Sequence, residues 1–282
     1  MVYGSKPTDG GNFLMNDIEK EQFLKDEPEA SKFVRPFISA HEYLRNEKRW
    51  VLWLFEANPN ELRKLPKVMA RINAVEQFRK ASKASSTRDY EFPSLFRQIT
   101  QPVSDYILIP RHTSEKRNYI PFGFFSKNVI VGDSCLSMPD ATLFHFAVLT
   151  NSMHMAWVRT VCGRLKSDFR YSKDIVYNNF PWPEVNALQT AKIEAAAQVV
   201  LDARAVHTNA SLADLYDPLT MPANLLKAHQ ALDKAVDAAY GYKGAATDAA
   251  RVAFLFERYQ QITSLLPALV SKTKKVTKKP SN

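Results

Sequence analysis

The spacing of hydrophobic residues predicts a mixture of helices and strands in the first third of the chain. Helical spacing extends from about Asp17 to Lys25. The apolar run from Trp50 to Phe55 is typical of a buried strand. Pro66 then opens a helix that directs Val68 inward and Arg79 outward.

Shorter elements are predicted around and after these. Ser39 and Glu42 have the spacing of a capping box, which predicts a short helix there. Residues 143–161 have helical spacing throughout. Short β-like runs, broken by Pro and Gly, cover residues 105–110, 119–125 and 127–131.

From Ala187 onward the pattern is helical only and rich in Ala, with helices expected at about 187–206, 222–240 and 247–264. The sequence therefore predicts an α+β fold, in which a mixed α/β domain is followed by a small all-α bundle. We place the mixed domain at 1–183, the helical domain at 184–270 and a disordered, Lys-rich tail at 271–282.

Charge gives the first indication of a partner. The net charge is +9, and residues 111–173 carry nine basic and only four acidic side chains. A basic segment that is also rich in aromatic residues favours nucleic acid. The tail contributes five lysines, whose simplest interpretation is a solubilising end.

Several kinds of catalytic site lack their sequence patterns. No G-x-G occurs, and the only Asn-Pro pair, at Asn58, lacks the aromatic residue of a methyltransferase loop and is typical of a helix N-cap. No lysine follows an acid by two residues, as metal-dependent nucleases commonly require. The six histidines and two cysteines show no metal-binding spacing, and His145 is expected to be a core residue. We therefore expect no enzymatic activity of this chain alone.

No apolar run is long enough to cross a bilayer and the first residues do not form a signal peptide, so a cytoplasmic location without membrane contact is expected.

Two polar stretches, 110–121 and 162–172, contain candidate binding residues. Both combine donors suited to phosphate with acid or amide groups suited to base edges. Composition alone leaves open that both are solvated surface loops.

The sequence resembles a known family. The run from Arg170 to Pro183 is R-Y-S-K-D-I-V-Y-N-N-F-P-W-P, which is similar to the end of the recognition domain in fused restriction–modification enzymes. Further similarity to the MmeI-like, type IIL group lies in residues 3–11, 152–159, 163–168 and 212–222, so it covers nearly the whole chain.

This resemblance implies a target-recognition domain with a helical C-terminal segment. Complete members also carry a nuclease, a helical spacer and an adenine-N6 methyltransferase that uses S-adenosylmethionine, with Mg²⁺ expected for cleavage. The expected partners are double-stranded DNA and those catalytic domains, and no cofactor is expected on this chain. The chain starts where recognition starts, so we expect a fragment or a separate subunit.

The resemblance also points to base-reading residues. Lys166 and Asp168 are two residues apart, so an extended backbone would place both on one face. A lysine donates to guanine and a carboxylate accepts from cytosine, so together they could read one G·C pair. A surface ion pair is the alternative. The matching base-reading positions are Arg111, Asp133, Ser134, Lys166, Asp168 and Arg170.

A second set is expected to contact the DNA backbone: Arg117, Lys127, Arg159, Arg164, Tyr171 and Ser172. Trp157 and Trp182 are expected to pack rather than stack on bases. Residues 178–182 either seat the domain against the methyltransferase or form a turn into the C-terminal helices. Two other functions stay open: an RNA-binding or scaffold module, and a methyltransferase or nuclease with an unrecognised site.

Overall fold

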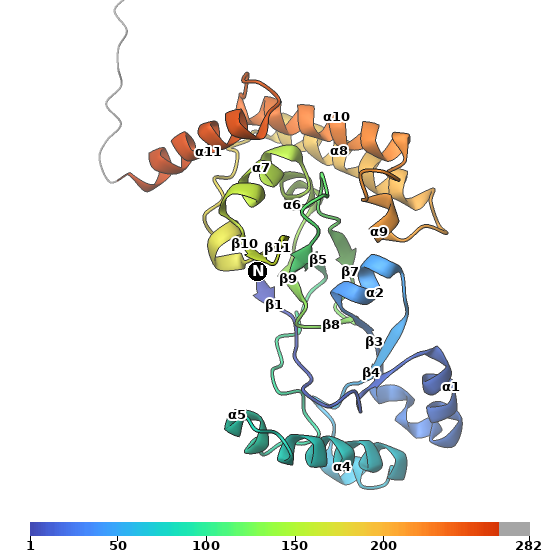
Figure 1. Cartoon of the computed structure of the whole chain (residues 1–282). Helices are drawn as coiled ribbons and strands as arrows, with labels where there is room; N and C mark the ends of the chain where they lie inside the picture. Colours follow the sequence, from blue (N-terminus) through green and yellow to red (C-terminus); the bar gives the residue numbers. More distant parts are fainter. Residues whose placement is uncertain (265–282) are drawn as a thin grey trace, which may run out of the picture.

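The computed structural model describes residues 1–264 and has two lobes joined by a narrow seam (Figure 1). Helices α4 and α5 form the base of the lower lobe, and α8, α10 and α11 cover the top of the upper lobe. The tail predicted at 271–282 lies outside the described residues, as does the end of the predicted helical domain. Among the described helices, none is both long and apolar enough to span a membrane.

The lower lobe (residues 13–99) packs helices against a small sheet. Its core includes Phe13, Met15, Leu52 and Val68, and its sheet has the strand order β2-β4-β3-β8. The predicted strand at 50–55 is shorter than expected, and ends at Leu52. The elements are β2 (Leu14–Met15), α1 (Asp17–Asp26), a 3₁₀ helix (Pro28–Phe33), β3 (Val34–Ile38), β4 (Arg49–Leu52), α3 (Pro59–Leu62), α4 (Pro66–Lys80) and α5 (Ser85–Arg88).

Two buried charges hold the lower lobe together. The carboxylate of Glu27 accepts hydrogen bonds of 2.9 Å from the backbone N–H groups of Lys67 and Val68, and so caps α4. Arg79 is 2% exposed, so its predicted outward position is wrong. Its guanidinium donates to four backbone carbonyls, at Pro7, Thr8, Phe92 and Leu95, because segments distant in sequence cover this face of α4.

The seam between the lobes is a parallel pairing of β3 with β8 (Ile130–Val131). Gly4 lies against Gly132 just beyond it, where a Cβ on Gly4 would sit 2.1 Å from the Gly132 carbonyl oxygen, so only glycine fits. Helix α2 (Ala40–Arg45) lies beside the seam, and the predicted capping box of Ser39 and Glu42 is confirmed at its start.

The upper lobe is built on an antiparallel sheet of order β1-β9-β5-β7. The predicted helical stretch 143–161 is two helices, because Asn151 interrupts it. The Asn151 side chain donates to the carbonyls of Ala147 and Val148 and accepts from the N–H groups of Met153 and His154. The elements are β1 (Val2–Tyr3), β5 (Tyr106–Pro110), β7 (Gly123–Phe125), β9 (Cys135–Pro139), α6 (Leu143–Leu149) and α7 (Ser152–Val161).

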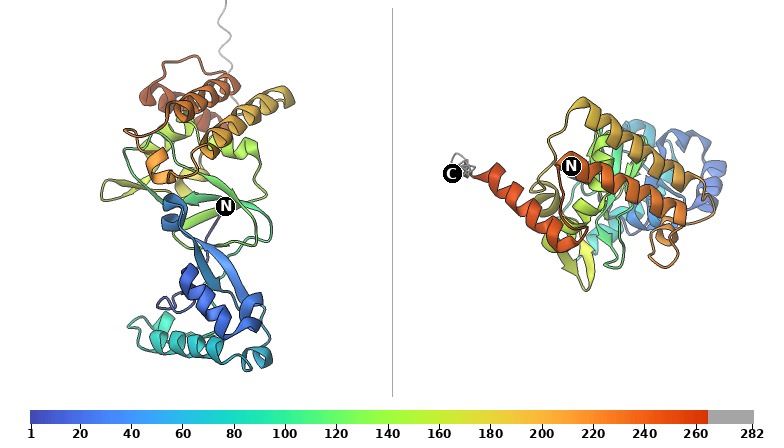
Figure 2. Two further views of the ribbon diagram at one scale, coloured as in Figure 1. Left: turned by 90° about the vertical axis from the view of Figure 1, so that its right-hand side faces the viewer. Right: turned by 90° about the horizontal axis from the view of Figure 1, so that it is seen from above.

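The three predicted C-terminal helices match the predicted spans to within about a residue. They are α8 (Ala187–Ala205), α10 (Ala223–Tyr240) and α11 (Asp248–Thr263), and a short helix that was not predicted, α9 (Leu212–Leu215), lies between α8 and α10 in the chain. Helices α8 and α10 lie side by side over α6 and α7 (Figure 2). Their buried residues, including Ile193 and Leu232, belong to the same apolar cluster as Ile107 and Trp157. The helices therefore share one core with the preceding domain and do not enclose a separate one.

Candidate nucleic-acid interface

The third sheet brings the two polar stretches together. Strands β10 (Gly163–Leu165) and β11 (Asp168–Arg170) form a hairpin, and β11 also pairs with β6 (His112–Thr113). In this register Arg170 lies opposite His112. The 111–118 loop and the 163–170 hairpin, about 50 residues apart in sequence, therefore form one surface.

Arg111 connects this surface to the loop that follows the seam. Its guanidinium donates to the carbonyl of Asp133 at 2.8 Å, and its N–H donates to the carbonyl of Ser134 at 3.0 Å. Its own carbonyl accepts from the N–H of Tyr171 at 2.7 Å. Three segments thus meet at one point. We call Arg111, His112, Asp133, Ser134 and Arg170 the polar cluster.

Lys166 and Asp168 do not have the extended arrangement that was predicted. Leu165 pairs with Asp168, so Lys166 and Ser167 form the two-residue turn of the hairpin. Lys166 has a φ of 56°, a left-handed conformation that such turns require. Both Lys166 and Asp168 are exposed, and no ion pair joins them in the described structure. The alternative of a surface ion pair is therefore absent from this conformation.

The side chain of Arg164 stabilises the hairpin. Its guanidinium donates to Glu115 at 3.1 Å and to the carbonyl of Ser167 at 2.7 Å, and lies 4.3 Å from the centroid of the Phe169 ring. The N–H of Glu115 also approaches Asp168, at 3.4 Å. Glu115 thus contacts both Arg164 and Asp168, and it belongs to the other polar stretch.

Three of the residues predicted to contact the DNA backbone use their side chains for contacts within the protein. Tyr171 is 1% exposed and shares a 2.9 Å hydrogen bond with His154, so the prediction of a phosphate contact is wrong. Arg117 is 9% exposed and donates to Thr113, so it too is excluded as a surface ligand in this conformation. Arg159 forms an ion pair of 2.9 Å with Asp248.

The other three residues are more accessible. Arg164 is exposed and Ser172 is half-buried beside the hairpin. Lys127 is exposed, but its N–H bonds to Asp105 at the far end of β5 from Arg111. At about 3.4 Å per residue, the length of β5 places Lys127 roughly 20 Å from the polar cluster. The structure therefore does not bring Lys127 together with the other candidates.

Sequence reasoning missed His112 and Glu115. Burial lowers the pKa of His112, and the positive charges of Arg111 and Arg170 lower it further, although Asp168 opposes them. The imidazole is therefore neutral near neutral pH and can donate one hydrogen bond and accept another. Both residues were within a polar stretch, but only the strand pairing, which is not local in sequence, shows what they face.

Other histidines have structural roles. His145 is half-buried and accepts from the N–H of Thr142 at the start of α6, so its predicted place in the core is wrong. The histidines that are fully buried are His154 and His229. Trp157 is 2% exposed and donates to the carbonyl of Val176, which confirms packing rather than base stacking. Trp182 is half-buried and packs on Phe180. Among the described residues, no three His, Cys, Asp or Glu side chains are grouped to hold a metal.

Comparisons with known proteins give the family of the chain. Residues 1–184 match the family described as the MmeI target recognition domain, and residues 185–267 match the MmeI C-terminal domain. The solved structure of the type IIL restriction–modification enzyme MmeI in complex with DNA superposes with a TM-score of 0.90. The two sequences are 50% identical, and the superposition covers 94% of this chain and 35% of the MmeI chain.

A curated relative is DNA methyltransferase A of Bacillus subtilis (strain 168), which is 34% identical over 93% of this chain and 30% of its own length. The chain spans about a third of the length of these relatives. It belongs to the MmeI target-recognition-domain family and continues from residue 185 into the MmeI C-terminal domain.

Proposed function

We propose that this chain reads a specific DNA sequence for a fused type II restriction–modification enzyme with adenine-N6 methyltransferase activity. One observation carries the proposal. Strand pairing and the contacts of Arg111 gather residues from three separate segments into the polar cluster, beside an exposed hairpin tip. The combination of fixed donors, acceptors and nearby positive charge is what base readout in a groove requires.

Two further observations support a DNA partner. Residues 111–173 contain the whole polar cluster and carry nine basic and four acidic side chains, a net charge of +5. The structural relative at 50% identity was solved in complex with DNA.

We assign base reading to Arg111, Asp133, Ser134, Lys166, Asp168 and Arg170, and we add His112. We assign phosphate contacts to Arg164 and Ser172. Lys127 would contact the DNA backbone only at a point well away from the polar cluster. An arginine or lysine can donate to guanine, whereas Asp133 or Asp168 can accept from the amino group of cytosine.

Catalysis is proposed to reside outside this chain. The sequence lacks a G-x-G turn for S-adenosylmethionine and an acid-x-Lys pattern for a metal-dependent nuclease. We therefore assign S-adenosylmethionine and Mg²⁺ to the methyltransferase and nuclease domains of the complete enzyme. Within this chain we retain 1–183 as the recognition domain and 184–270 as the helical domain, and a cytoplasmic location remains a prediction.

Selection from a randomised duplex library, followed by titration of the selected duplex at several salt concentrations, tests the proposal. We expect one preferred sequence and a linear fall of log K with log salt. Arg164→Ala should reduce that slope by about 0.9 if Arg164 neutralises one phosphate. Lys227→Ala is the matched control, since Lys227 is exposed on α10 at the top of the molecule, away from the hairpin (Figure 1).

Equal affinity for RNA and for scrambled DNA would contradict the proposal and favour the RNA-binding or scaffold alternative. An affinity that does not change with salt would also contradict it, because phosphate neutralisation releases counterions.

A further inference from the structure

The C-terminal helices make several polar contacts at the end of the first polar stretch, at residues 117–122. The hydroxyl of Tyr119 donates to the carboxylate of Asp233 on α10 at 2.7 Å. Its ring stacks on His229 of the same helix, with centroids 4.0 Å apart and planes 17° from parallel. Tyr119 is thus held from α10 by both its ring and its hydroxyl.

Asp233 joins three elements. Besides Tyr119, it accepts from the N–H of Ser152 at 2.7 Å and from the Ser152 hydroxyl at 2.6 Å, at the first turn of α7. Burial raises the pKa of Asp233, and these hydrogen bonds oppose that rise. The carboxylate therefore fixes the end of the 111–118 loop against α7 and α10 together.

Arg159 makes a second connection. One nitrogen of its guanidinium donates to both carboxylate oxygens of Asp248, the first residue of α11, at 3.1 and 2.9 Å. The second terminal nitrogen of the guanidinium donates to the carbonyl of Arg117 at 3.2 Å. Arg117 in turn closes a turn through its N–H to the carbonyl of Ser114, at 3.2 Å. Helix α11 is therefore linked to the turn that carries Glu115.

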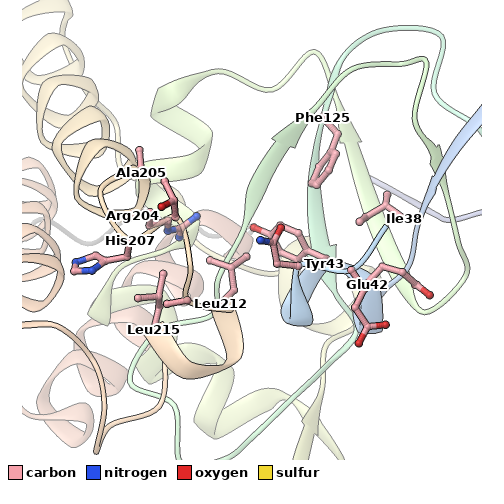
Figure 3. A pocket seen from close by; sticks show the side chains of 13 residues that line it. Ile38, Glu42, Tyr43, Phe125, Arg204, Ala205, His207, Leu212 and Leu215 are labelled. Atoms are coloured by element: carbon pink, nitrogen blue, oxygen red, sulfur yellow. The ribbon is translucent and has the colours of Figure 1, made fainter. Parts of the chain in front are cut away.

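A third connection lies at the edge of a cavity of about 420 Å³ between α2 and the α8–α9 turn (Figure 3). Arg204, on α8, donates to the carbonyl of Phe122 and to the hydroxyl of Tyr216. It thereby fixes the chain just after Tyr119.

We propose that the C-terminal helical segment is a positioning element for base recognition. Asp233 and Asp248, acting through Tyr119 and Arg159, hold the 114–117 turn where Glu115 can orient Arg164 and Asp168. This inference rests on the proposed function, since it assigns a role within DNA reading. Apolar packing in the shared core would dock the helices without these polar contacts, which reach residues 117–122 directly at Tyr119 and Phe122 and through Arg159 at Arg117.

The test uses the full chain and the double variant Tyr119→Phe with Arg159→Lys. The first change removes one hydroxyl and leaves the ring on His229. The second keeps a positive charge toward Asp248, but a lysine cannot also reach the Arg117 carbonyl with a second nitrogen. The matched control is Tyr240→Phe, which likewise removes one buried hydroxyl from a contact of α10, here a hydrogen bond of 2.9 Å to the carbonyl of Pro181. That contact does not involve the 111–118 loop.

Two readouts are needed. Hydrogen exchange of the amides at 114–119 reports the turn without DNA, and library selection reports base preference. We expect faster exchange in the double variant, and discrimination at the base pair read by the hairpin reduced between about twofold and thirtyfold. Non-specific affinity should stay unchanged. The control should keep both the exchange rate and the preference, although its melting temperature falls by a similar amount. Adding back the hydroxyl or the arginine alone should restore part of the discrimination.

Exchange and preference that match those of the unaltered chain would overturn the inference, and so would faster exchange with an unchanged preference. Equal losses in the control would also overturn it, since they would reflect stability alone. If the unaltered chain prefers no DNA sequence, the proposed function fails, and the role in base recognition falls with it. The exchange measurement would then report only whether the turn is held.

Discussion

Exchanging the charges at the tip of the hairpin should change the base that the chain prefers. The double substitution Lys166→Glu with Asp168→Arg puts an acceptor where a donor was, and a donor where an acceptor was. If these side chains read one G·C pair, the preferred base at that position should change from G to C on the same strand. The rest of the recognised sequence should stay the same.

The structure sets the expected size of two effects of this double substitution, on folding stability and on base discrimination. Both side chains are exposed, and among residues 1–264 the one hydrogen-bond contact of either side chain is the 3.4 Å approach of Asp168 to the N–H of Glu115. Glutamate and lysine are both unbranched at Cβ, so the left-handed backbone at Lys166 disfavours them similarly. The free energy of unfolding should therefore change by no more than about 0.5 kcal/mol. Discrimination at the one base pair should change by about 1–3 kcal/mol, or roughly 5- to 150-fold.

Selection from a randomised duplex library measures this directly, and thermal denaturation checks that both proteins are equally folded. Each single substitution should lose discrimination without gaining a new preference, because one base edge then faces a group of the wrong kind. An unchanged preference in the double variant would refute base reading by this pair. A uniform loss of affinity at all positions would instead mean that the pair contacts the DNA backbone or maintains the hairpin.

Three other predictions concern stability and catalysis. Tyr171→Phe should lower the free energy of unfolding by about 1–3 kcal/mol, because buried His154 loses its partner, and should leave the salt dependence of DNA binding unchanged; urea denaturation and a salt titration test both. Burial lowers the pKa of His154 to about 3, below its ordinary 6.5 in the unfolded chain, so its contribution to stability is complete above pH 6.5 and is lost toward pH 3. Stability should therefore fall more steeply between pH 7 and pH 5 than in His154→Gln, by up to about 1.4 kcal/mol per pH unit, and equal slopes in urea denaturation would contradict this. Incubation with duplex DNA, labelled S-adenosylmethionine and Mg²⁺ should give no methyl transfer or cleavage above a buffer control; either activity would favour the enzymatic alternative.

Local patterns in the sequence predicted local structure well. The capping box at Ser39 and the proline at the start of α4 depend only on neighbouring residues, and both occur where expected. The limits of the C-terminal helices followed from periodicity alone. By contrast, the sequence did not predict that the helix is interrupted at Asn151, because the hydrophobic spacing is similar on both sides of that residue.

The candidate site was predictable as two stretches of chain but not as a surface. Periodicity could not show that Arg117 and Tyr171 face inward, because the contacts beside them include His154 and Arg159 of α7, which are distant in sequence. It also gave Lys166 an extended backbone, whereas the pairing of Leu165 with Asp168 forces a turn. In each case the deciding contact joins residues that are distant in sequence or depends on strand register.

The shared core determines which part of this protein can be exchanged between enzymes. Ile193 and Leu232 pack in the same cluster as Trp157, so the upper lobe and the C-terminal helices should melt in a single cooperative transition. A graft that ended at residue 183 would expose the apolar faces of α6 and α7 to water. A chimaera designed to acquire this DNA specificity should therefore receive the recognition domain together with helices α8, α10 and α11 as one piece.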